Sequence, residues 1–392
     1  KFRCQRNCFY QWNGMEWTEQ RKFTMRRLRD FGVGKSTMED VLKEDLGNLF
    51  EMLDKKLGKP FKMQQIFNVA VVNGLWKILT GKRFDLDDPK LKDLVKRMDE
   101  LFKVFGTGGS VLSIMPKLRY FAPGLTVWAR TQDNFRKLLG LMTSFMDDHV
   151  SNFTNCKEPE DFIDAFLKQV EESQIDTSFH GQLGHQNLSN VLLDLLLAGS
   201  ETTASALTYS VLLMIKYPEI QKKVQEEIFQ EVGIENLVSI TDKPKLPYTE
   251  AVVEESLRHI LGSLAIPHYA LEDFTIGHGE YFIPKDTWVL PNLYEISKNP
   301  DAFQDPHTFN PQRFLDANGK FVKNGEFAVF GVGKRECPGK SLAQMELFLF
   351  FANMMQRYNF QSVLNDLTLL DLKPVFGLAP VPKPFEVLMN KN

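Results

Sequence analysis

Cysteine is scarce in this chain. Four cysteines occur among 392 residues, Cys4, Cys8, Cys156 and Cys337, and they are too few and too scattered for a disulfide framework. Cys4 and Cys8 also lack the matching second pair that a zinc site of this spacing needs. We therefore expect the cysteines to be free thiols in a protein exposed to a reducing compartment.

Several other features are absent. The net charge is only −3, which argues against nucleic acid as the main partner. No signal peptide or transmembrane segment is visible, and the chain has no internal repeat, low-complexity tract or nucleotide-binding glycine pattern. Hydrophobic residues make up 43% of the chain and charged residues 25%. This composition is typical of a globular protein with a sizeable core.

The most informative stretch is Phe330–Gly339, which reads FGVGKRECPG. A strong helical pattern, Lys340–Arg357, follows it directly. A thiol just before a helix N-terminus lies where backbone N–H groups and the helix dipole favour the thiolate, which here is that of Cys337. Gly333 and Gly339 allow backbone geometry that a side chain would forbid, or close approach to something flat.

An arginine completes this pattern, because Arg335 offers a rigid donor fork for a carboxylate. A thiolate ligand, room for a flat group and a donor for a carboxylate are together what a haem with its propionates needs. The filled pattern F-x-x-G-x-R-x-C-x-G resembles the haem-binding signature of the cytochrome P-450 monooxygenases. The resemblance implies haem b with Cys337 as iron ligand, Arg335 on a propionate, and Phe330, Gly331 and Gly339 around the ligand. A structural cysteine in a glycine loop is the alternative.

The resemblance covers essentially the whole chain and implies a mainly α fold with a small β portion, the cytochrome P-450 fold. It implies one haem-thiolate domain over residues 1–392. Gly81–Asp85 resembles the family-2 type of animal members, and Met115–Tyr120 is similar to the arthropod branch. Family members carry a region before the first motif, with a membrane anchor in microsomal members. We therefore expect a fragment that lacks the anchor and the first strands and helices.

A long apolar helical pattern, Leu188–Tyr217, has a polar centre. Threonine hydroxyls there can bond to the carbonyl four residues back and loosen the helix. The centre resembles the family motif A-G-x-[DE]-T, which opens room for dioxygen over the haem. That resemblance places Ala198 beside the haem and makes Glu201 and Thr202 an acid–alcohol pair that relays protons. An N-cap between two shorter helices is the alternative.

Two further positions resemble haem-propionate contacts. Trp17 and Arg21 are four residues apart and share a helix face, and the family has W-x-x-x-R on a helix that crosses the haem edge. His268 follows a proline where relatives place a propionate-binding arginine or histidine. The first helix is also basic, and its face is either solvated or a docking patch for an acidic electron donor. Its positive residues are Arg21, Lys22, Arg26, Arg27 and Arg29.

A third group resembles the structural network of the family. Glu255 and Arg258 have i,i+3 spacing and can pair on one helix face. On spacing alone, Glu254 could pair with Arg258 equally well. Matching the chain to the family pattern favours Glu255 as the acid. It also adds a third residue, Arg313, which is the arginine of the family motif P-x-R-F. We expect these three residues to stabilise the fold and to help retain the haem. We expect no catalytic role for them.

Substrate-pocket candidates come from the same resemblance. They are Phe102, Phe105, Leu112, Leu264, Ile266 and Leu378. For the first three, core packing is an equal explanation. The substrate itself is expected to be small and apolar: a steroid, fatty acid, terpenoid or xenobiotic.

The remaining periodicity predicts helices, short strands around Tyr281–Ile283 and Thr287–Leu290, and a terminal strand. The helices are expected at Met38–Leu57, Met63–Thr80, Pro89–Phe105, Thr126–Phe153, Pro159–Ser173, Glu219–Glu231 and Tyr248–Arg258. Pro159 is placed in the first turn of its helix, and Gln174–Gln186 is expected to be a loop. The apolar segment Phe385–Met389 is expected to be an edge strand.

The resemblance implies insertion of one atom of dioxygen into the substrate, with NADPH supplying electrons through a separate flavoprotein reductase. Cytochrome b5 is a second electron donor compatible with it. The family also implies the cytosolic face of the endoplasmic reticulum membrane, with attachment through the missing N-terminus. Two alternatives remain: a haem-thiolate isomerase or dehydratase, and a helical scaffold without haem.

Overall fold

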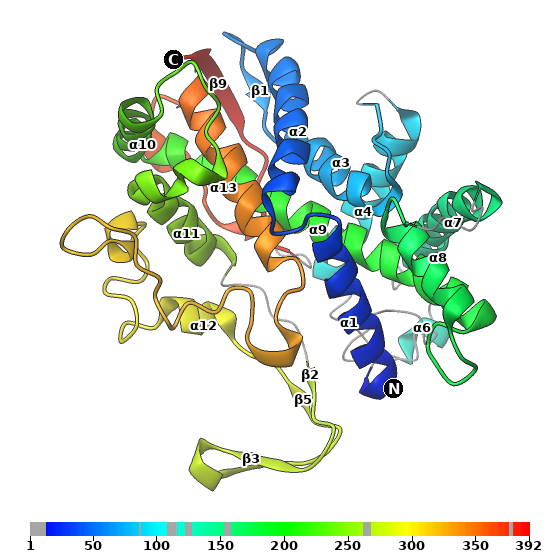
Figure 1. The fold of residues 1–392 in the computed structure, drawn as a ribbon. Coiled ribbons are helices and arrows are strands. Elements are labelled where there is room, and N and C mark those ends of the chain that lie inside the picture. Colours follow the sequence, from blue (N-terminus) through cyan, green and yellow to red (C-terminus); the bar gives the residue numbers. More distant parts are fainter. Residues whose placement is uncertain are drawn as a thin grey trace. The chain divides into compact units, whose positions relative to one another are not determined.

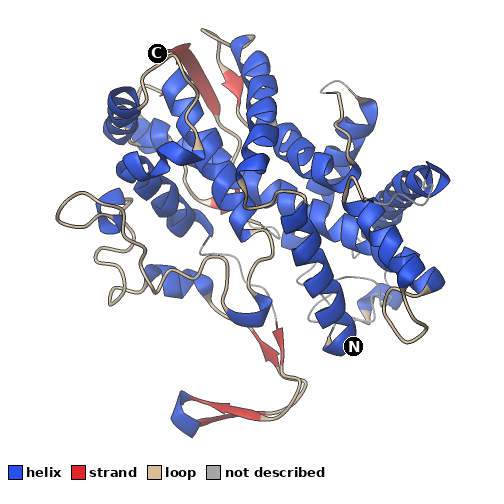
Figure 2. Ribbon diagram, in the orientation of Figure 1, coloured by secondary structure: helices blue, strands red, loops and turns tan. Residues whose placement is uncertain are grey.

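The computed structural model describes residues 13–85, 88–107, 115, 117–121, 128–152, 158–261, 268–375 and 379–392. Helices dominate and strands are short (Figure 2), so the expected mainly α fold with a small β portion is confirmed. The chain divides into two compact units, Lys1–Lys245 with Pro338–Asn392, and Leu246–Cys337.

The helices of the first unit follow the expected periodicity closely. They are α1 (Gly14–Asp30), α2 (Ser36–Asp54), α3 (Ile66–Thr80), α4 (Pro89–Thr107), α6 (Leu118–Phe121), α7 (Trp128–Asn152), α8 (Phe162–Glu172), α9 (Gly181–Lys216), α10 (Pro218–Glu231) and α13 (Lys340–Arg357). The last of these has the expected bounds. Within the described ranges, no helix combines the length and the hydropathy needed to cross a bilayer.

Helix α9 forms the centre of the first unit (Figure 1). It packs against α3, α7, α8 and α13, and nearly all of its length from Leu188 to Ile215 is buried. The helix begins at Gly181, so the expected loop at Gln174–Gln186 was wrong over its second half. Gly184 lies within the helix at a point where a Cβ would overlap the carbonyl oxygen of Phe179. Close packing, not turn formation, requires this glycine.

Helix α8, by contrast, begins later than expected. The prediction put Pro159 in its first turn, but the helix starts at Phe162. The Asp161 carboxylate accepts a hydrogen bond from the backbone N–H of Asp164 at 2.9 Å. Asp161 is therefore the N-cap, and Pro159 lies outside the helix.

The first unit also contains a three-stranded antiparallel sheet. Its order is β1 (Phe61–Lys62), β9 (Glu386–Lys391), β6 (Tyr358–Ser362), so the terminal strand is central, and the prediction of an edge strand was wrong. Val387 and Met389 are fully buried, and the nearby prolines precede β9 instead of interrupting it. A strand with unbroken donors can pair on both sides. Strands β7 (Pro374–Val375) and β8 (Val381–Pro382) pair separately.

The second unit contains α11 (Pro247–Leu261), α12 (Leu293–Lys298) and two antiparallel strand pairs. β2 (His268–Tyr269) pairs with β5 (Trp288–Val289), and β3 (Phe274–Ile276) pairs with β4 (Tyr281–Ile283). Its core includes Ala251, Phe303 and Phe314. A large share of this small core is aromatic.

Candidate active site

The cysteine loop ends the second unit. The backbone N–H of Cys337 donates to the carbonyl of Phe330 at 2.8 Å, and that of Glu336 donates to Gly333 at 3.1 Å. Arg335 ends a short 3₁₀ helix, Gly333–Arg335, and is half-buried. The side chain of Cys337 is exposed. The loop thus presents an accessible thiol on a backbone held by its own hydrogen bonds.

Two of the loop glycines have left-handed backbone angles. Gly331 has φ of 72° and Gly333 has φ of 74°, conformations in which a Cβ is strained. Gly339 has φ of −87°, so of the two expected reasons for this glycine the unusual backbone geometry does not apply, and close approach to a flat group stays a prediction. Gly339 is the residue that caps α13, and its carbonyl accepts the N–H of Ala343 at 2.8 Å.

The centre of α9 carries the expected backbone hydrogen bond. The Thr202 hydroxyl donates to the carbonyl of Ala198 at 2.7 Å. The helix is continuous through this point, so the alternative of an N-cap between two shorter helices was wrong. Ala198 and Thr202 are only half-buried, whereas Ser200 and Glu201 are buried. One face of a buried helix therefore opens where a hydroxyl and small residues lie.

The buried Glu201 carboxylate has a contact that the sequence did not reveal. Asn68 of α3 donates its Nδ2 to Glu201 Oε2 at 2.6 Å. The only signal in the sequence is that Asn68 is one of the few polar residues in a mostly apolar helix.

The first helix places its two expected residues together. The Arg21 guanidinium lies 5.7 Å from the ring centre of Trp17, within the range of a cation–π contact, and both side chains are half-buried. Of the basic residues on this helix, Lys22, Arg26 and Arg29 are exposed.

The second unit brings the three residues of the expected network together. Arg258 donates to Glu255 through Nε at 2.6 Å and Nη2 at 2.9 Å, and Arg313 Nε donates to Glu255 Oε1 at 3.1 Å. The side chains of Glu255 and Arg258 are fully buried, and that of Arg313 is 9% exposed. The remaining donors of both arginines bind backbone carbonyls between Ser297 and Thr308. The network therefore ties α11 to the loop that follows α12.

The other candidates are less well placed by the structure. His268 lies in β2 opposite Val289 and is half-buried. Phe102 is 3% exposed in the core of the first unit. The remaining pocket candidates lie outside the residues or side chains that the structure describes. They are Phe105, Leu112, Leu264, Ile266 and Leu378.

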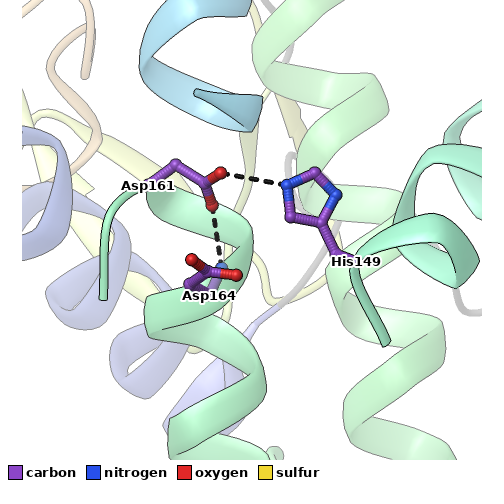
Figure 3. A group of neighbouring side chains, drawn as sticks. All are labelled: His149, Asp161 and Asp164. Atoms are coloured by element: carbon purple, nitrogen blue, oxygen red, sulfur yellow. Dashed lines mark hydrogen bonds and ion pairs between the residues drawn. The ribbon is translucent and has the colours of Figure 1, made fainter. Parts of the chain in front are cut away.

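A histidine with two aspartates forms a second cluster, which the sequence did not suggest (Figure 3). His149 of α7 contacts Asp161 through Nε2 at 2.9 Å and the carbonyl of Phe145 through Nδ1 at 2.9 Å. The hydrogen bond to Asp161 raises the pKa of His149 against the opposing effect of burial. Both ring nitrogens face oxygen acceptors, so the protonated ring can donate a hydrogen bond from each of them. The cluster is an ion pair between α7 and the cap of α8.

The residues of the cysteine loop fit a bound haem. The exposed thiol supplies the soft ligand that iron takes in haem-thiolate proteins. Among the described residues, a Cβ on the exposed Gly333 would meet no atom within 4 Å, so no described atom blocks the approach of a group to the loop at this point. In the first unit, the half-buried face around Thr202 is a separate opening in a buried helix. A cysteine loop of this kind in a mainly helical protein is typical of a haem-thiolate protein.

Comparison with known proteins gives the family. A family model described as Cytochrome P450 matches residues 2–389. The chain is 33% identical to Farnesoate epoxidase of Bombyx mori over 96% of this chain and 75% of that protein. It is 34% identical to Cytochrome P450 2J5 of Mus musculus, over 96% and 73%, and 35% identical to Cytochrome P450 2H1 of Gallus gallus, over 96% and 75%. The chain belongs to the cytochrome P450 family. It is a haem-thiolate monooxygenase, and a scaffold without enzymatic function is not supported.

Proposed function

We propose that this protein inserts one atom of dioxygen into a small apolar substrate at a haem b that Cys337 ligates. NADPH supplies the electrons through a separate flavoprotein reductase, with cytochrome b5 as a second donor. The observation that carries the assignment is the exposed Cys337 thiol, set on a loop held by the bond to Phe330. Both units together form one catalytic domain in this proposal.

The chain's own residues have distinct tasks in this mechanism. When bound, haem would supply dioxygen activation, with the Cys337 thiolate as the ligand of its iron. Arg335, Arg21 and His268 would hold the propionates, because cationic and N–H donors form charge-assisted bonds with carboxylates, and Trp17 would pack beside them. Ala198, Phe330, Gly331 and Gly339 would line the haem surface.

Proton supply is the task of the centre of α9. Thr202 holds its hydroxyl at the open face, where its bond to Ala198 weakens the helix ladder. Glu201 is the neighbouring acid, and the pair acts as a positioned general acid. Glu255, Arg258 and Arg313 contribute by holding the loop after α12 in place.

The substrate class is an apolar small molecule. Farnesoate is the first compound to test, because a relative named for its epoxidation aligns over 96% of this chain. A steroid, a fatty acid and a xenobiotic complete the panel. The protein acts at the cytosolic face of the endoplasmic reticulum membrane, and the exposed basic face of α1 with Lys22, Arg26 and Arg29 fits an acidic electron donor.

The ligand assignment is tested by the absorbance spectrum of the reduced, carbon-monoxide-bound protein. The parent should show the strongly red-shifted Soret band of a thiolate-ligated haem, and Cys337→Ser should lose it together with monooxygenation. Cys156→Ser, the same substitution at another cysteine, should keep both. A Cys337→Ser protein that retains the band refutes the assignment.

The proton relay is tested by the fraction of NADPH electrons that reach product. Thr202→Ala should uncouple NADPH consumption from product formation. Thr208→Ala is the matched control, because Thr208 makes the same 2.7 Å bond to the carbonyl four residues back, in a buried part of the helix. Equal coupling in both variants would remove Thr202 from the mechanism. Turnover that needs neither NADPH nor dioxygen would favour an isomerase or dehydratase.

A further inference from the structure

The Glu201 carboxylate of α9 accepts a hydrogen bond from an amide of α3. The donor is Nδ2 of Asn68, which lies 2.6 Å from Glu201 Oε2 across 133 residues of sequence. Asn68 is 5% exposed and Glu201 is 6% exposed. A hydrogen bond from an amide to an ionised carboxylate is stronger than one between neutral groups, and burial reduces competition from water.

The other buried asparagine of α3 has a different partner. Thirteen of the 15 residues of α3 are buried, most of them apolar. Its other asparagine, Asn73, exchanges two hydrogen bonds of 3.0 Å with the backbone of Phe84 and so fixes the turn after the helix. Asn68 donates instead to a side chain of α9. A buried amide costs free energy unless it is hydrogen-bonded, and its partner here is the acid of the proposed relay.

The two members of the relay are held on different sides of α9. Successive residues of an α-helix point about 100° apart. Glu201 is buried and held by Asn68 of α3, whereas Thr202 lies on the half-buried face and bonds to Ala198. The carboxylate is therefore anchored beside the open face and not within it.

We propose that Asn68 is a positioning residue for proton supply: its amide holds the Glu201 carboxylate and sets how readily that carboxylate exchanges protons with the face of Thr202. The proposal rests on the acid role of Glu201 given above. Asn68 itself touches neither substrate nor haem in this proposal. It acts through one hydrogen bond.

Asn68→Asp is the most informative variant, because it keeps the shape of the side chain and removes the N–H donor. Two buried carboxylates then face each other near neutral pH, and their mutual repulsion raises the pH at which the first of them takes up a proton. The holoenzyme should lose coupling of NADPH oxidation to product several-fold near neutral pH. Coupling should recover at mildly acidic pH, since the introduced carboxyl group, once protonated, would donate an O–H where the amide donated an N–H. A purely structural role would not produce this recovery.

Two controls separate the bond from general damage. Asn73→Ala removes the other buried asparagine of α3 and should lower stability while leaving the pH profile of coupling unchanged. A double-mutant cycle of Asn68→Ala and Glu201→Gln, read from urea midpoints of the haem-loaded protein, measures the contact without turnover. The two midpoint shifts should be clearly non-additive.

The outcomes distinguish the two proposals. If Glu201→Gln leaves coupling unchanged, the acid role of Glu201 is refuted and the proposal for Asn68 falls with it. If Glu201→Gln uncouples the reaction but Asn68→Asp matches the parent at every pH, only the role of Asn68 is refuted. Additive midpoint shifts in the cycle would also overturn it.

Discussion

Replacing Glu255 with glutamine should destabilise the second unit strongly. The Glu255 carboxylate accepts from Arg258 Nε and Nη2, from Arg313 Nε at 3.1 Å and from the backbone N–H of Asn310 at 2.8 Å. Glutamine has one oxygen, and its NH₂ group would face guanidinium donors. At least two charge-assisted bonds are then lost, each worth about 1.5–3 kcal/mol.

The expected cost for Glu255→Gln is about 3–5 kcal/mol, the usual cost of breaking a buried ion pair by removing one partner. The large value arises because Arg258 is fully buried and cannot recover its hydration. A domain is typically stable by about 5–15 kcal/mol, so this variant should lose much of the stability of the second unit. It should also lose haem more readily, since the network holds the loop between Ser297 and Thr308.

The assay is hydrogen exchange of α11 and of residues 304–314 against urea concentration, which reports the local opening free energy. Glu295→Gln is the matched control, because Glu295 of α12 is exposed in the same unit, and its cost should stay within about 0.5 kcal/mol. A Glu255→Gln cost within about 1 kcal/mol of that control would show that the trio does not hold the unit together.

Three further substitutions test other parts of the fold. His149→Gln should lower the melting temperature at mildly acidic pH and have little effect at alkaline pH. The reason is that Asp161 raises the folded pKa of His149, so the stabilisation is full below the unfolded value of 6.5 and disappears as pH rises through the folded one. Equal losses at both pH values would contradict this reasoning. Gly184→Ala should cost about 1–3 kcal/mol in urea unfolding, because its Cβ would overlap the Phe179 carbonyl. Gly140→Ala, at a helical glycine with open space around it, should stabilise by up to about 1 kcal/mol; a loss as large as that of Gly184→Ala would contradict the packing argument.

The helices were predictable where their signals are local. The bounds of α13 agree with the prediction, because its apolar period continues up to Arg357 and a glycine precedes Lys340. The expected bond from Thr202 to Ala198 was also local, since it joins residues four apart.

The wrong predictions came from residues whose local preference was overridden by packing. Gly184 suggested a loop but serves close contact with Phe179. The prolines before β9 suggested an edge strand, although β9 itself has the donors to pair with both β1 and β6. The sequence predicts a helix start at Pro159, because composition alone does not show that Asp161, and not Pro159, marks the beginning of the helix.

The sequence by itself determined the mainly helical fold and carried the prediction for the cysteine loop, because both depend on residue types at fixed short spacing. Only the tertiary structure decided which distant side chains meet. Asn68 and Glu201 are 133 residues apart, and Glu255 and Arg313 are 58 apart. Such contacts depend on how helices pack, and packing is set by the shapes of many buried side chains together. The pattern of one segment does not contain that information.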